Sequence, residues 1–202
     1  MARGSASRTK AGLVTLLIGS AFIVAQVQAA FAENLRRLVF QETIEISRCE
    51  RFVASEEFSV GRPVGNRSLG SVSFNFARLF LTATEIADAY PVALQAWTLR
   101  YSADDVSLIA RLGGEERVVL PLCSIYRLME IGSRGASLAD AQNNFAYARS
   151  PVDHRVMAIH WFVNERNQWA IGAVEVPHPQ LDWPSGSRVY SKAVVAAEDQ
   201  SR

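Results

Sequence analysis

The chain has 202 residues, and its 21 lysines and arginines nearly balance 20 aspartates and glutamates, for a formal net charge of +1. This balance provides no basic surface for nucleic acid or anionic lipid, so both classes of partner are disfavoured. Hydrophobic residues make up 49% of the chain, which is enough for a single domain with a full core.

The first 32 residues have the order of regions that is typical of a secretory signal peptide. Three basic residues precede an uncharged apolar run over residues 11–25, and Ala30 and Ala32 supply the small side chains that a signal peptidase recognises. We therefore predict export to a bacterial periplasm or beyond, with cleavage after Ala32. The alternative is an uncleaved single-pass inner-membrane anchor, since a span needs about 20 predominantly apolar residues. Gln26 and Gln28 disfavour that alternative.

Cys49 and Cys123 are the only cysteines. In an oxidising compartment an even number of cysteines is interpreted first as a disulfide framework. We expect a Cys49–Cys123 bridge, which would stabilise the fold by roughly 4 kcal/mol in the loop-entropy model. The alternative is two unpaired buried thiols.

Short runs of alternating apolar and polar residues dominate the chain from residue 33 to residue 184. Residues 38–47 and 72–76 alternate in this way and are predicted strands. Residues 61–70, rich in turn-forming residues, predict a loop. Residues 82–90 are predicted to form a short helix with a capping box.

The second half of the chain adds more predicted strands and one longer helix. Three short apolar runs, over 97–101, 106–112 and 117–122, predict an antiparallel meander. A helix is predicted over 138–149, capped by Ser137, because Leu138, Ala141, Phe145 and Ala148 recur at helical spacing.

A hairpin over 156–163 and 168–176 follows, and its first strand is apolar on both faces, which places it in the middle of the structure. Residues 185–202 are predicted to be a polar, partly disordered tail. Residues 33–184 are thus expected to form one antiparallel β-rich α+β domain, sandwich or barrel-like, with the 138–149 helix packed on it.

The three histidines are the first candidates for chemistry. His154 adjoins Asp153, and with His160 and His178 these residues could gather as metal ligands or as a base and its orienting partner. None has the spacing of a known metal motif, and no nucleophile signature occurs. We therefore predict no catalytic residue, no metal and no cofactor, and we interpret His160 as a core histidine with a satisfied hydrogen bond.

Aromatic side chains offer candidate binding residues. Most of them are expected in the core, because tryptophan is highly buried on average. Trp183 follows Asp182 beyond the last strong strand, where an exposed aromatic side chain would mark a binding patch.

These observations favour an exported, non-catalytic envelope protein, a binding or assembly module for a protein partner or a small apolar ligand. The alternatives are a periplasmic hydrolase or metal-dependent enzyme with residues assembled from distant loops, or a membrane-anchored accessory subunit if the signal is retained.

Overall fold

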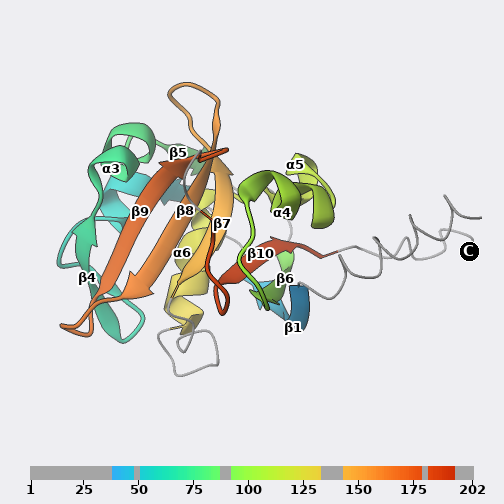
Figure 1. The fold of residues 1–202 in the computed structure, drawn as a ribbon. Coiled ribbons are helices and arrows are strands. Elements are labelled where there is room, and N and C mark those ends of the chain that lie inside the picture. Colours follow the sequence, from blue (N-terminus) through green and yellow to red (C-terminus); the bar gives the residue numbers. More distant parts are fainter. Residues whose placement is uncertain (1–37, 48–50, 87–91, 133–142, 179–181, 194–202) are drawn as a thin grey trace, which may run out of the picture. The chain divides into compact units, whose positions relative to one another are not determined.

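A computed structural model describes residues 38–47, 51–86, 92–132, 143–178 and 182–193 (Figure 1). The predicted signal peptide, residues 1–32, lies outside the described residues. None of the described helices combines the length and the hydrophobicity that a membrane span requires.

One large sheet dominates the described residues. Its strands, in chain order, are β1 (Leu38–Ile46), β3 (Pro63–Val64), β4 (Arg67–Val72), β6 (Val92–Leu99), β7 (Asn144–Arg149), β8 (Val156–Val163), β9 (Trp169–Glu175) and β10 (Arg188–Lys192). Across the sheet they lie in the order β1-β6-β10-β7-β8-β9-β4-β3. The predicted β-rich α+β class is confirmed. The sheet is mixed rather than purely antiparallel, because β10 pairs with β7 and β4 pairs with β9 in parallel.

Helices and a smaller sheet complete the fold. The helices are α2 (Ala54–Glu57), α3 (Phe74–Phe80), α4 (Asp105–Arg111), α5 (Glu115–Val118) and α6 (Leu122–Gly132), and the smaller sheet pairs β2 (Arg51–Val53) with β5 (Thr84–Ile86). In Figure 1, α4 and α6 lie on opposite sides of the large sheet.

Each face of the large sheet carries its own hydrophobic cluster. Along β7, Ala146 and Ala148 belong to the cluster that contains α6, whereas Phe145 and Tyr147 belong to the cluster that contains α4. Successive strand residues point to opposite faces, so this alternation buries β7 on both sides. We call the first face the α6 face and the second the α4 face.

The predicted helix over 138–149 is wrong for its second half, because Asn144–Arg149 form strand β7. Residues 133–142 lie outside the described residues. The apolar residues that recur at helical spacing belong instead to a central strand. This strand buries aromatic side chains on one face and alanine side chains on the other. A strand buried on both faces loses the polar alternation that would have identified it.

The predicted tail is also wrong in part, because β10 occupies residues 188–192 in the middle of the sheet. The polar residues of this segment predict an exposed tail, but Arg188 and Ser191 are buried along with Val189 and Tyr190. Residues 194–202 lie outside the described residues.

Three segments predicted as strands, over 72–76, 106–112 and 117–122, are helical at least in part. Ser73 follows β4 as the N-cap of α3, and its Oγ accepts a hydrogen bond from the Phe76 amide (3.2 Å). Phe74 is consequently 78% exposed while Phe76 is buried.

In the predicted meander, only the first run overlaps a strand, β6. The Asp104 carboxylate accepts a hydrogen bond from the Ser107 amide (2.8 Å) and caps α4, and contacts with Ser107 lower the pKa of Asp104. Helices α4, α5 and α6 therefore replace the strands predicted over 106–112 and 117–122.

Glu85 caps α6 from another part of the chain. Its carboxylate accepts hydrogen bonds from the amides of Leu122 (2.8 Å) and Cys123 (3.0 Å), which satisfies two donors that a helix start leaves open. Burial raises the pKa of Glu85 even though these two bonds lower it. Residues 84–86 are strand β5, so the helix predicted over 82–90 is wrong for that segment.

The first strand and the later hairpin are confirmed. β1 covers Leu38–Ile46, and β8 pairs antiparallel with β9, ending at the pair Val163–Trp169. The turn is held by the Asn164 side chain, whose Oδ1 accepts from the amides of Arg166 and Gln168, each at 3.0 Å.

Candidate functional site

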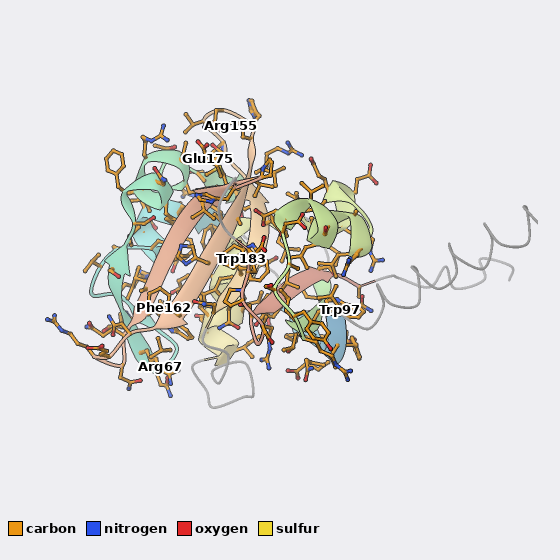
Figure 2. The ribbon with its side chains drawn as sticks, viewed as in Figure 1. Arg67, Trp97, Arg155, Phe162, Glu175 and Trp183 are labelled. Carbon is orange, nitrogen blue, oxygen red and sulfur yellow. The ribbon has the colours of Figure 1, made fainter. Side chains whose placement is uncertain are left out.

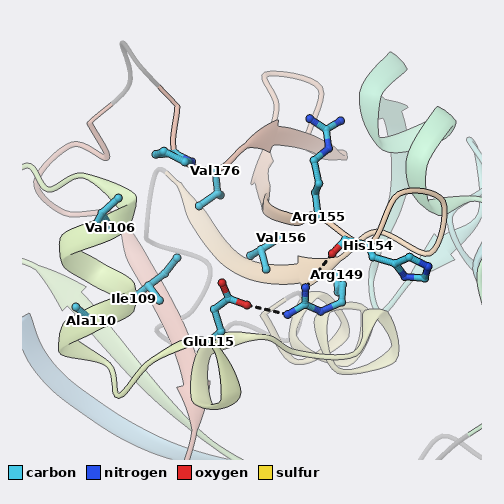
Figure 3. A pocket seen from close by; sticks show the side chains of 10 residues that line it. Val106, Ile109, Ala110, Glu115, Arg149, His154, Arg155, Val156 and Val176 are labelled. Atoms are coloured by element: carbon cyan, nitrogen blue, oxygen red, sulfur yellow. Dashed lines mark hydrogen bonds and ion pairs between the residues drawn. The ribbon is translucent and has the colours of Figure 1, made fainter.

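A pocket of about 580 Å³ opens beside α4, next to the β7–β8 turn (Figure 3). One part of its lining is apolar and comes from Val106, Ile109, Ala110, Val156, Val176 and Pro177. The other part is polar and comes from Glu115, Arg149, His154 and Arg155.

Helix α4 supplies the apolar wall because three of its side chains share one face. Val106, Ile109 and Ala110 are spaced three and four residues apart, which places them side by side on a helix. Leu108 points the other way and is fully buried in the cluster on the α4 face. The helix is therefore fixed to the sheet by one side and faces the pocket with another.

The polar wall is built around Arg149 at the end of β7. Its Nη2 atom forms an ion pair with Glu115 Oε2 at 2.8 Å, and its Nη1 atom donates a hydrogen bond to the His154 carbonyl oxygen at 2.8 Å (Figure 3). About half of each charged side chain is exposed, 47% for Arg149 and 55% for Glu115. An ion pair so exposed stabilises the fold little, but it holds both a donor group and an acceptor group at the pocket.

Arg155 is held by two acids. Its guanidinium pairs with Asp153 at 2.7 Å and with Glu175 at 3.0 Å, and Figure 2 shows Arg155 and Glu175 close together at the open end of the β8–β9 hairpin, opposite its turn. Contact with Arg155 lowers the pKa of Asp153 to about 2. Asp153 therefore stays ionised at neutral pH as a partner of Arg155.

A buried carboxylate joins α4 to the segment behind the pocket. Asp105 is 2% exposed, and its Oδ1 atom accepts hydrogen bonds from Trp183 Nε1 (2.7 Å) and from the Tyr147 hydroxyl (2.9 Å). Its Oδ2 atom accepts from the backbone amide of His178 at 3.5 Å. Burial, followed by the charge of Asp105, raises the pKa of Tyr147. This network fixes α4 against the sheet and against the chain that follows Pro177.

The expectation that Trp183 is exposed is wrong. It is 4% exposed and stacks on Phe145 with ring centroids 3.9 Å apart and an interplanar angle of 6°. Asp182 is exposed, but without an exposed tryptophan beside it the proposed patch loses its apolar part. The segment is covered because the chain goes on to form β10 beside β7.

The structure places the three histidines at different points. His154 lies in the β7–β8 turn at a φ of 59°, with its ring turned away from the apolar wall (Figure 3). His160 lies on β8 beside Phe162 and Trp183, and burial lowers its pKa. His178 follows Pro177. Across the described ranges, no three His, Cys, Asp or Glu side chains form a group that could hold a metal ion.

Cys123 is 7% exposed at the start of α6. Cys49 lies outside the described residues, so the predicted bridge stays a prediction.

Arg149, Arg155 and Glu115 were missed as site residues from the sequence. No sequence motif links Glu115 to an arginine 34 residues later. The chain matches no protein-family model, no curated protein and no solved structure.

Proposed function

We propose that the protein is an exported, non-catalytic binding module of the cell envelope. Its ligand is a small molecule with an apolar body and a polar end. One observation carries the proposal: the apolar side chains of α4 face the Arg149–Glu115 ion pair across one pocket.

The size and lining of the pocket suit such a ligand. A volume of about 580 Å³ falls within the roughly 300–1,000 Å³ that is usual for small-molecule sites, which combine apolar walls with a few polar groups. The apolar body would contact Ile109 and Val156. The polar end would exchange hydrogen bonds with Arg149 and Glu115, which offer a donor and an acceptor.

The electrostatics of the charged residues favour binding over acid–base chemistry. A general acid or base works best when its pKa lies near the operating pH. Asp153 has a depressed pKa because it is paired with Arg155. Arg149 is committed to Glu115 and to the His154 carbonyl.

A blocked pocket tests the proposal. Ala110 is exposed and lines the pocket, so Ala110→Trp fills the space without entering the core. Val60→Trp is the matched control, because Val60 is 66% exposed and does not line the pocket. The probe is 1-anilinonaphthalene-8-sulfonate, which has an apolar body and an anionic end.

We expect saturable dye fluorescence with the unmodified protein and with Val60→Trp, and at least a tenfold weaker affinity with Ala110→Trp. Equal affinity in all three proteins, or no saturable binding to the unmodified protein, would contradict the proposal. Thermal unfolding of each variant confirms that the fold is retained.

A further inference from the structure

Arg188 is a buried cation, and two of its donor atoms have no hydrogen-bond partner. It is the first residue of β10, in register with Thr98 on β6 and Asn144 on β7, and it is only 7% exposed. Its Nε and Nη1 atoms are buried, and neither has a hydrogen-bond partner. A guanidinium group cannot release its charge in a protein, so Arg188 remains cationic in this environment.

Two neutral side chains, Tyr190 and Asn144, lie beside Arg188 in the sheet. Tyr190 lies two residues along β10, so both side chains point to the α6 face. The Tyr190 hydroxyl donates a hydrogen bond to Asn144 Oδ1 at 2.9 Å. The Tyr190 ring stacks on Trp161, with ring centroids 5.5 Å apart. Burial raises the pKa of Tyr190, and the charge of Arg188 and a side-chain hydrogen bond with it oppose that rise.

Such an arrangement is costly without a negative charge. Buried charges are normally paired, and buried donors normally have acceptors. Among the ion pairs of the described residues, none includes Arg188. Glu42 on β1 acts electrostatically on Tyr190, which makes it the acid to consider if the compensating charge belongs to the protein.

We propose that Arg188 anchors an internal site for a small oxyanion, a carboxylate or a phosphate. Guanidinium groups favour both anions, because their planar donors match the geometry of carboxylate and phosphate oxygens. The oxyanion would accept hydrogen bonds from Nε and Nη1. This site is separate from the ligand pocket, since Arg188 points to the α6 face whereas Ile109 and Val156 of the pocket pack against the cluster on the α4 face.

The test compares thermal unfolding in chloride buffer with unfolding in inorganic phosphate, sulfate or acetate at equal ionic strength. The variants are Arg188→Met, the pocket variant Arg149→Met and Arg166→Met. Arg166 is exposed in the β8–β9 turn, so its variant loses the same charge without touching either site. Comparing phosphate, sulfate and acetate identifies the oxyanion that the site prefers.

At an anion concentration about one hundred times the dissociation constant, the melting temperature should rise by about 5–10 °C for the unmodified protein, Arg149→Met and Arg166→Met. Arg188→Met should not respond. In chloride it should be at least as stable as the unmodified protein, because an uncompensated buried charge has been removed.

Three outcomes would overturn the proposal. The first is an unmodified protein that responds to none of the oxyanions. The second is an Arg188→Met variant that still responds. The third is an Arg188→Met variant that is clearly less stable in chloride or fails to fold, which would place the compensating acid, such as Glu42, within the protein. Loss of the response in Arg149→Met instead would assign the anion to the pocket, and the dye experiment would still test that pocket.

Discussion

Substitution of Trp183 by alanine should destabilise the protein by about 3–5 kcal/mol, the usual cost of deleting a buried aromatic side chain. Two contacts account for this magnitude. The indole stacks on Phe145 with ring centroids 3.9 Å apart, and its Nε1 atom donates to Asp105 at 2.7 Å. Trp183→Phe separates them, because phenylalanine can keep the stacking but not the donor. That variant should cost about 1–3 kcal/mol, the range for leaving a buried acceptor with one partner fewer.

Urea unfolding followed by far-ultraviolet circular dichroism measures both losses, provided that the denaturant slope stays constant among the variants. Tyr101→Ala is the control, because Tyr101 is 61% exposed and surface substitutions usually change stability by less than about 0.5 kcal/mol. If Trp183→Ala lost no more than that control, the indole would not be a core side chain. If Trp183→Phe matched Trp183→Ala, the donor to Asp105 would account for the whole effect and the stacking for none.

Three further outcomes are expected. Denatured, unreduced protein should show no titratable thiol, and reduction should lower the free energy of unfolding by roughly 4 kcal/mol if Cys49 and Cys123 are bridged; two titratable thiols would exclude the bridge. Mass spectrometry of the protein from its native host should find a chain cleaved after Ala32, and a chain that retains residues 1–32 would favour the anchor. Burial lowers the pKa of His160 in the folded state, so the unfolded chain binds the proton more readily and stability should fall as the pH drops below about 6.5. His160→Gln should flatten that dependence, and an unchanged pH profile would assign it to other groups.

The alternation of apolar and polar residues was sufficient to predict a strand where one face of that strand is solvated or where the adjoining turn is well marked. β1 and the β8–β9 hairpin were therefore predictable, the hairpin because Asn164 favours a turn between two apolar runs. α6 also left a signal, since Leu122, Ile125 and Met129 recur at helical spacing after Pro121. The competing assignment of 117–122 to a strand obscured it.

The rest depended on tertiary contacts that a single sequence does not display. β7 could not be distinguished from a helix because it is buried on both faces, and β10 looked like a polar tail because its polar side chains are buried. The pocket is the clearest example of a feature that depends on tertiary contacts. Glu115 and Arg149 become partners only because α5 contacts the end of β7 in the folded chain. Nothing in their spacing distinguishes them from surface charge.

The position of β10 has a consequence for the order in which the sheet can be completed. β10 follows every other described strand in the chain, yet it lies between β6 and β7. Among the described strands, β1 and β6 are thus linked by strand pairing to β7, β8 and β9 only through β10. Until that strand arrives, β6 and β7 each present an open edge. For a chain exported as proposed, these two parts of the sheet could pair through β10 only after residues 188–192 have crossed the membrane.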